Sequence, residues 1–502
     1  MIKIKINGKE YKVKENLTIL EAARQVGVEI PHLCYHPALE PEGSCRMCLV
    51  EIKGVPKLQL ACSTLVKDGM EVETDNEKVR EARKAVLEFL LAGHPLDCPI
   101  CDKAGECKLQ DYYYKYGLFE DKFEEEKPRR NKLMRIAPNL ILDQERCILC
   151  TRCVRFLREI TKTEELGVFN RGKESLISVY EQELVENNYS GNLVDICPVG
   201  AITDIDFRFK MRTWFLEKKK SICPLCGRGC NINIHFLPDT FPFKRERRVY
   251  RITPEPNPKI NGYWICNLGR YGYHYIDNDR ILVPSKRNEN SEKLEEISWR
   301  EFYEDIGNKI KVLIRRKKGE KIGAVVNLSL TNEEYEILKV FFKQCVPQSE
   351  IIVLGKEKGK GDNFLLTEDR NSNTRGAKKF GFIEKKIDIK KFLNNKELVI
   401  FFGHEITEHY GIQFLSEILK NIKTKVLIAS NKGPLINLMD YILPSCVVAE
   451  KEGSFINCEG ITQKFNRVLE PLGKSKSEIE ILTSLAQKSG IWRNFLLYRR
   501  TG

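Results

Sequence analysis

Long apolar runs are missing from this chain of 502 residues. No segment approaches the roughly 18 apolar residues of a membrane-spanning helix, and the best candidate, 398–403, reads as one buried strand. The first ten residues alternate apolar and charged side chains, which is not the pattern of a signal peptide. With 42% apolar and 30% charged residues, the composition also excludes a disordered, collagenous or membrane-embedded protein.

Nucleotide-binding motifs are missing as well. No G-x-G-x-x-G follows a predicted strand and opens a helix, and no Walker A motif occurs. The glycines at 227 and 229 lie inside a cysteine-rich loop, where we expect them to serve the geometry of the cysteines. We therefore expect no NADH or flavin site, no recognisable quinone site and no catalytic nucleophile or base in this chain.

Cysteine, in contrast, is abundant, with 18 residues in the chain. Fifteen of them lie before residue 267, nearly all in C-x2-C groupings. A disulfide scaffold is the usual explanation in a short secreted domain, but this chain is long and shows no export signal. The grouping instead indicates metal or cluster ligation in a reducing compartment.

The first group is predicted to lie in a small domain that opens with a hairpin. Apolar and charged residues alternate on both sides of an Asn7-Gly8 turn, and a helix is expected near 18–26, where Thr18 and Glu21 fit a capping box. This hairpin, helix and cysteine loop resemble a 2Fe–2S ferredoxin of the β-grasp kind. The first gap is longer than in the plant-type motif, and zinc is the alternative. The ligands of this group are Cys34, Cys45, Cys48 and Cys62.

The second group follows a predicted helix. Thr74 and Glu77 fit a capping box at its start, and Gly93 ends it. Its apolar face is expected to consist of Val79, Ala82, Val86 and Leu90. The ligands would be His94, Cys98, Cys101 and Cys107. One histidine and three cysteines suit zinc as well as a 4Fe–4S cluster, and such a histidine is often only a hydrogen-bond partner, so spacing alone does not decide.

The third group has the spacing C-x2-C-x2-C, which is typical of iron–sulfur ligation. A two-cluster bacterial ferredoxin would place a fourth cysteine at position 157, where this chain has Leu157. One cluster is therefore expected, with its last ligand in the distant Cys-Pro pair at 197–198. The ligands are Cys147, Cys150, Cys153 and Cys197.

The fourth group also fits a zinc ribbon by its spacing. Its ligands would be Cys223, Cys226, Cys230 and Cys266. Aromatic and arginine residues follow, and they suit either a nucleic-acid stacking surface or, more often, a shield around a buried site. They are Tyr263, Trp264, Arg270, Tyr271 and Tyr273.

Four groups in this order resemble the large iron–sulfur subunit (the G subunit) of bacterial NADH–quinone oxidoreductase, respiratory complex I. The most specific elements are H-x3-C-x2-C-x5-C at 94–107 and C-x2-C-x2-C-x43-C-P at 147–198. The resemblance implies a 2Fe–2S cluster on the first group and 4Fe–4S clusters on the other three, with His94 as a ligand. It also implies electron flow from the 2Fe–2S centre to the third group and then the second, with the fourth off this route and chiefly structural.

The same resemblance implies the setting of the chain. Its partners would be the flavin- and NADH-binding subunit, a 2Fe–2S subunit and the iron–sulfur subunits of the quinone module. It would work at the cytoplasmic side of the bacterial inner membrane, held there only through these partners, without nucleic acid.

Residues 281–502 carry a fainter resemblance, to molybdopterin oxidoreductases, in the stretches 371–381 and 442–465. A helix headed by Ser298 and strands at 323–327, 397–403 and 425–429 predict a parallel α/β sheet. We expect a shortened, degenerate scaffold without molybdenum, because the cofactor needs further sub-domains and a metal ligand. The cysteines available are interpreted as small buried side chains: Cys345, Cys446 and Cys458.

The predicted fold class is therefore α+β iron–sulfur domains followed by an α/β parallel-sheet domain. The expected boundaries are 1–75 for the 2Fe–2S domain, 76–118 for the His/Cys3 4Fe–4S domain, 119–215 for the ferredoxin-like 4Fe–4S domain, 216–280 for the 4Fe–4S domain of molybdopterin-oxidoreductase type and 281–502 for the scaffold.

The net charge is +13, and most of the excess lies in the back half. We interpret the basic stretch 356–391 as a solvated surface. The alternatives are a surface that binds an acidic partner, lipid headgroups or nucleic acid.

Two other functions fit parts of the pattern. An NAD-linked formate dehydrogenase or hydrogenase would share the first two groups, but usually carries two ferredoxin-type clusters and an active-site ligand set. A non-redox zinc scaffold would be colourless and hold about one zinc per group.

Overall fold

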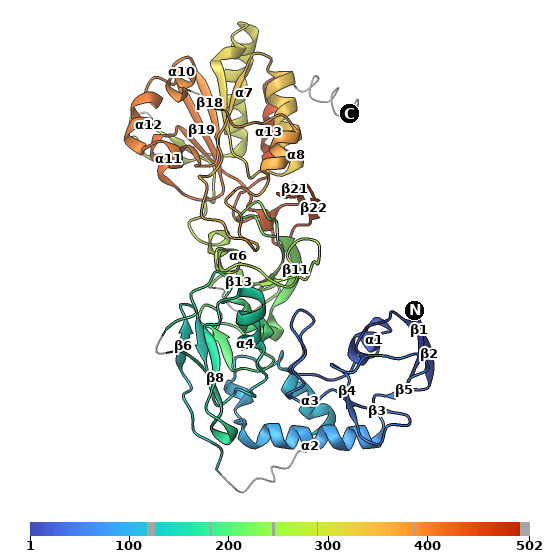
Figure 1. Cartoon of the computed structure of the whole chain (residues 1–502). Helices are drawn as coiled ribbons and strands as arrows, with labels where there is room; N and C mark the ends of the chain where they lie inside the picture. Colours follow the sequence, from blue (N-terminus) through green and yellow to red (C-terminus); the bar gives the residue numbers. More distant parts are fainter. Residues whose placement is uncertain (118–125, 181–182, 243–245, 289, 386–387, 492–502) are drawn as a thin grey trace. The chain divides into compact units, whose positions relative to one another are not determined.

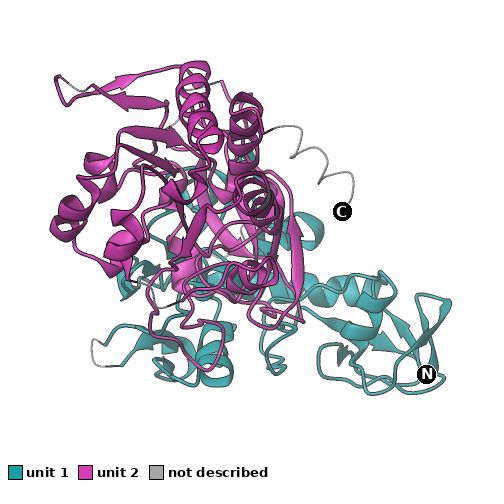
Figure 2. Ribbon diagram, turned by 90° about the horizontal axis from the view of Figure 1, so that it is seen from above, with its two compact units in different colours: residues 1–217 teal, residues 218–502 magenta. Residues whose placement is uncertain are grey.

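The computed structural model describes residues 1–117, 126–180, 183–242, 246–288, 290–385 and 388–491. The chain divides into two compact units, residues 1–217 and 218–502 (Figure 2). Each unit is described by itself, with the element labels of Figure 1.

The first domain is a five-stranded sheet in the order β2-β1-β5-β3-β4, with one helix against it. Asn7 and Gly8 have φ of 47° and 76°, the left-handed values that a tight hairpin turn requires, and Thr18 and Glu21 form the predicted capping box. The sequence prediction for this region is thus confirmed. Its elements are β1 (Ile2–Ile6), β2 (Lys9–Val13), α1 (Ile19–Gln25), β3 (Leu49–Ile52), β4 (Gln59–Leu60) and β5 (Glu71–Glu73).

The start of α2 (Glu77–Gly93) differs from the prediction. Asn76 caps the helix, accepting a hydrogen bond from the Val79 N–H at 3.0 Å. The Thr74 hydroxyl is unavailable for capping because it accepts a hydrogen bond from the Asn7 side-chain amide at 2.8 Å. The Thr74 N–H also donates to Asn7 Oδ1 at 2.8 Å, which ties the strand end to the first hairpin.

The buried face of α2 was also predicted wrongly in part. Val79 is buried as expected, but Ala82, Val86 and Leu90 are only half-buried. The buried face contains Arg83 and Leu87 instead. Arg83 is buried because its guanidinium donates to the Tyr116 hydroxyl of α3 (Lys108–Tyr116) at 3.2 Å.

The rest of the first unit is built from short elements around loops. A three-stranded sheet in the order β10-β7-β6 and a two-stranded hairpin, β8–β9, flank the third cysteine group. The elements are β6 (Met134–Ala137), β7 (Leu140–Leu142), α4 (Arg152–Phe156), which continues as a π turn over Leu157–Thr161, β8 (Leu166–Phe169), β9 (Leu176–Val179), α5 (Asn192–Ile196) and β10 (Ile202–Asp204).

The second unit begins with a three-stranded sheet, β11-β12-β13, in which β12 and β13 are antiparallel. Its small elements are β11 (Glu217–Ile222), β12 (Asn231–Phe236), β13 (Val249–Pro254), α6 (Asn267–Tyr271) and the hairpin of β21 (Gly453–Ile456) and β22 (Thr462–Phe465).

A seven-stranded sheet, β15-β14-β20-β19-β18-β16-β17, forms the larger part of this unit. The five strands from β20 to β17 are parallel, as predicted, and β14 and β15 add an antiparallel edge. The strands are β14 (Ser285–Arg287), β15 (Leu294–Glu296), β16 (Ile322–Val326), β17 (Glu350–Val353), β18 (Leu398–Phe402), β19 (Thr424–Ala429) and β20 (Tyr441–Pro444).

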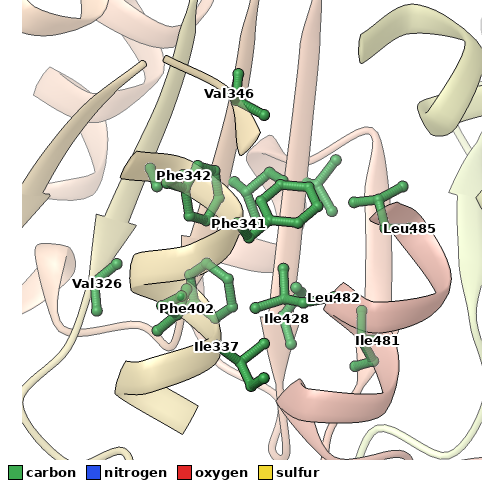
Figure 3. Packing of buried hydrophobic residues seen from close by; sticks show 14 of the residues in the cluster. Val326, Ile337, Phe341, Phe342, Val346, Phe402, Ile428, Ile481, Leu482 and Leu485 are labelled. Carbon is green, nitrogen blue, oxygen red and sulfur yellow. The ribbon is translucent and has the colours of Figure 1, made fainter. Parts of the chain in front are cut away.

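Helices cover both faces of this sheet (Figure 1). One face packs against α7 (Trp299–Arg315), α8 (Asn332–Leu338) and α13 (Glu478–Lys488), and Figure 3 shows the aromatic and aliphatic side chains of that core. The other face packs against α10 (Ile389–Asn394) and α12 (Ile412–Leu419). The remaining helices are α9 (Thr374–Lys379) and α11 (Ile406–His409). Part of the predicted basic stretch, 386–387, lies outside the described residues.

Candidate metal centres

The first cysteine group is buried and arranged as two pairs. The register of β3 and β4 aligns Leu49 with Leu60, and this places Cys48 beside Cys62. The loop before β3 brings Cys34 beside Cys45, whose sulfur accepts hydrogen bonds from the Leu33 and Cys34 N–H groups at 3.4 Å. Two thiol pairs suit a two-iron centre, in which each iron takes two protein ligands.

Within this loop the pKa values of the two paired thiols, Cys34 and Cys45, are shifted in opposite directions. The hydrogen bond with Cys45 lowers the pKa of the Cys34 thiol to about 5, and the same bond together with burial raises the pKa of Cys45. Glycine at position 43 lets this loop lie close to β4. Its φ is 70°, and a Cβ there would lie 3.0 Å from the Leu60 side chain.

In the second group the histidine is free to act as a ligand. Burial lowers the pKa of His94 to about 4, which keeps the ring neutral near pH 7. Its Nδ1 is buried without a hydrogen-bond partner. A neutral imidazole with an unpaired ring nitrogen is what a metal or cluster ligand requires.

The cysteines of this group share the surroundings of His94. Asp97 and Arg146 influence the pKa of both His94 and Cys101, and burial raises the pKa of Cys107 to about 11. Arg146 binds Asp97 with two hydrogen bonds, Nε to Oδ1 at 3.1 Å and Nη2 to Oδ2 at 2.6 Å. This ion pair joins the second loop to the segment entering the third, and the sequence reasoning did not identify it.

Gly200 brings the second and third groups into contact. A Cβ at this position would lie 2.3 Å from Cys101 Sγ and 3.2 Å from Lys103 Cβ in the same loop. The backbone that follows Cys197 therefore lies directly against a sulfur of the second group. The one feature of the sequence that indicates this contact is the glycine three residues after Cys197.

The third group lines one small cavity with all four of its cysteines. The remaining lining is mostly apolar and comes from β7, β9 and the segment after α5. Burial raises the pKa of Cys147 to about 12 and of Cys150 to about 11, so these thiols are neutral until a cation replaces their protons. An apolar cavity lined by four cysteines fits a 4Fe–4S cluster.

The fourth group also converges. Burial raises the pKa of Cys223, and the neighbouring thiols of Cys226 and Cys266 raise it further. The Cys223 N–H donates to the Cys230 carbonyl at 2.9 Å. Gly229 has φ of 65°, a left-handed conformation that favours glycine in this loop. The flanking Trp264 is buried, in agreement with a shielding role. The other buried members of that flank are Arg270 and Tyr273.

The hairpin β21–β22 holds the backbone of the fourth loop. The Gln463 side chain donates to the Gly229 carbonyl at 2.8 Å, and the Cys458 N–H donates to the Gly227 carbonyl at 2.7 Å. The Asn457 side-chain amide donates to the Arg228 carbonyl at 3.3 Å. The back region thus supports a ligand loop that lies more than 200 residues earlier in the chain.

The three remaining cysteines are not part of these sets. Cys345, at the end of the π turn that continues α8, and Cys446, after β20, are buried as predicted. Cys458 is only half-buried, contrary to the prediction, because it lies in the turn of the β21–β22 hairpin beside Cys226.

Across the described part of the chain, no three histidine, cysteine or acidic side chains converge closely enough to hold a single metal ion.

Family comparisons match most of the chain. Residues 1–77 match a 2Fe-2S iron-sulfur cluster binding domain and 83–122 an NADH-ubiquinone oxidoreductase-G iron-sulfur binding region. Residues 137–203 match the ferredoxin-like domain of NADH-quinone oxidoreductase subunit 3. Residues 216–278 match a molybdopterin oxidoreductase Fe4S4 domain, and 356–488 match molybdopterin oxidoreductase.

Two curated relatives illustrate the similarity. The G subunit of NADH-quinone oxidoreductase from Rickettsia felis is 40% identical over 344 residues, which cover 68% of this chain and 49% of the relative. NADH-quinone oxidoreductase subunit 3 of Thermus thermophilus is 35% identical over 368 residues, covering 66% of this chain and 45% of the relative. The chain spans about half the length of the curated relatives it matches.

Among solved structures, a chain of the NAD+-reducing [NiFe]-hydrogenase in the H2-reduced state is 31% identical, with a TM-score of 0.38. The match covers 42% of this chain and 91% of that chain.

Proposed function

We propose that the chain belongs to the G-subunit family of NADH–quinone oxidoreductase, whose members it matches over about two thirds of its own length, and that it is an electron-transfer subunit of such an enzyme. It would relay electrons from an NADH- and flavin-binding subunit towards the quinone-reducing subunits. The observation that carries this proposal is the arrangement of one histidine and fifteen cysteines as four sets of four.

The residues fit one 2Fe–2S and three 4Fe–4S clusters. When bound, such clusters accept and release single electrons, and the protein sets their position and potential. The thiol pairs of the first group would hold the 2Fe–2S cluster. In the second group His94 would offer Nδ1, which is buried and unpaired, together with three thiolates. The four cysteines around the third cavity and the four of the fourth loop would each hold a 4Fe–4S cluster.

We propose that electrons pass from the first group to the third and then to the second. The contact of Gly200 with Cys101 supports the last step, because it brings the backbone after Cys197 directly against a sulfur of the second group. The fourth group would have a chiefly structural role, which its attachment to the β21–β22 hairpin supports.

The back region would be a scaffold without molybdenum. A buried Lys451 pairs with Glu334 at 2.6 Å and with Glu478 at 3.1 Å, which ties the segment before β21 to α8 and α13. Such a closed network favours a fixed architecture, and the position of Cys345 within the hydrophobic core supports this proposal.

The partners would be the flavin- and NADH-binding subunit, a 2Fe–2S subunit and iron–sulfur subunits of the quinone module. Within the described ranges, no helix has the length and apolar character needed to cross a bilayer. We propose attachment to the cytoplasmic side of the inner membrane through those partners.

Reduction of the isolated full chain tests this function. Dithionite should bleach its visible absorption, whereas NADH alone should not, because electrons would need the flavin subunit. Rapid bleaching by NADH alone would contradict the proposal that this chain only relays electrons.

A further inference from the structure

Two arginines of α4 lie between the first and third cysteine groups. Arg152 and Arg155 follow Cys150 by two and five positions and are 6% and 1% exposed. Both side chains reach the loop that carries Cys34, more than 110 residues earlier in the chain.

Arg155 joins the two loops through carbonyl groups. Its Nη2 donates to the Cys34 carbonyl at 2.5 Å and to the Cys150 carbonyl at 3.2 Å. Its Nη1 donates to the Glu40 carbonyl, and its Nε to Thr151 Oγ1 at 3.1 Å. One guanidinium therefore fixes a ligand residue of the first group against a ligand residue of the third.

Arg152 makes a second bridge of the same kind. Its Nη2 donates to the Tyr35 carbonyl, next to Cys34, and its Nη1 donates to the Ile196 carbonyl at 3.0 Å, next to Cys197. Its Nε is buried without a partner. Together the two arginines contact the two segments that carry the cysteines of the third group. They also contact the long loop that carries Cys34 of the first group.

The charge of these arginines is poorly neutralised by carboxylates. Across the described residues, no acidic side chain forms an ion pair with Arg152, and Arg155 has only the half-exposed Glu42 at 3.9 Å. A buried cation without a counter-ion is unfavourable, and neutral carbonyls supply only part of the compensation. The groups whose negative charge would favour the charged form of Arg152 are the thiols of both sets: Cys150, Cys197, Cys34 and Cys45.

We propose that Arg152 and Arg155 are positioning residues that clamp the first cluster loop to the third and raise the reduction potentials of both clusters. This inference rests on the proposed cluster assignment. A fixed positive charge stabilises the reduced and more negative state of a neighbouring cluster. Placed between two clusters, the same charge acts on both, and the carbonyl bridges keep the ligand loops at a fixed separation for electron transfer.

The test is a redox titration of the full chain, purified without oxygen and followed by electron paramagnetic resonance. Arg152→Gln and Arg155→Gln remove the charge, Arg152→Lys and Arg155→Lys retain it without the planar fork, and Arg158→Gln is the matched control. Arg158 lies on the π turn that continues α4, and its side chain is 55% exposed beside Glu159.

Each Gln variant should make both the 2Fe–2S and the third-group cluster harder to reduce. We expect about a tenfold change in the reduction equilibrium, about 59 mV for a one-electron couple. The Lys variants should keep potentials near those of the unmutated chain but show faster amide hydrogen exchange over residues 33–42. Arg158→Gln should change neither property.

Three results would overturn the proposal: potentials that stay at the Arg158→Gln values, a shift in only one of the two clusters, or Lys variants with unchanged exchange at 33–42. If a Gln variant fails to load iron, the exchange result of its Lys counterpart decides. Iron analysis of the unmutated chain comes first. Zinc in place of iron would refute the proposed function, while the exchange experiment would still test the clamp.

Discussion

Gly200 offers a sharp test of the contact between the second and third cysteine groups. In Gly200→Ala, the new methyl carbon would lie 2.3 Å from Cys101 Sγ, whereas ordinary contact begins at 3.4 Å. Either that sulfur or the backbone after Cys197 must move by about 1.1 Å. Overpacking of this kind lowers the free energy of unfolding by about 1–3 kcal/mol, which is roughly a five- to 150-fold loss in the folding equilibrium constant.

The assay is iron content together with electron paramagnetic resonance of the dithionite-reduced full chain. Gly200→Ala should lose or alter the signal of the second-group 4Fe–4S cluster and leave the 2Fe–2S signal intact. Gly93→Ala is the matched control, since a Cβ there meets nothing within 4 Å although the residue precedes His94. Identical spectra for the two variants would refute the reasoning that Gly200 closes the gap between the groups.

Three further changes test other parts of the structure. His94→Ala should remove or shift one 4Fe–4S signal without affecting the 2Fe–2S signal; unchanged spectra would show that His94 is not a ligand. Gln463→Ala leaves a carbonyl of the fourth loop without its partner, at a cost of about 1–3 kcal/mol, and should lower fourth-cluster occupancy by iron analysis; a loss just as large in the exposed control Lys464→Ala would contradict this role. Burial raises the pKa of Glu478 to about 8, above its ordinary value, so between the two values the folded chain binds more protons than the unfolded chain. The free energy of unfolding of the back unit should therefore fall from about pH 5 to about pH 8 in denaturant titrations, and Glu478→Gln should flatten this dependence; equal slopes would contradict the role of Glu478.

Local signals in the sequence predicted local structure well. The turn at Asn7, the capping box of Thr18 and the helix start at Ser298 involve residues within a few positions of each other, so their chemistry is visible in the sequence. Thr74 looked equally suitable as a cap, but its hydrogen bonds go to the first hairpin. A residue 67 positions away decided its role, and no local pattern shows that.

The ligand sets stay predictions, and they rest on the same kind of local signal. C-x2-C spacing places sulfurs on one tight loop, and this arrangement is a local property of the chain. The links between sets are not local. Arg146, Arg152 and Arg155 look like ordinary basic residues in the sequence, and only the fold brings them to partners 49 to 121 positions away. Their importance follows from burial and from the groups they bridge.

Metal analysis of the full chain, purified without oxygen, tests the central claim most directly. Iron and acid-labile sulfide should be present in the amounts expected for one 2Fe–2S and three 4Fe–4S clusters, with little zinc or molybdenum. Reduction should give distinct 2Fe–2S and 4Fe–4S resonances. A colourless protein with about one zinc per cysteine group would contradict the account.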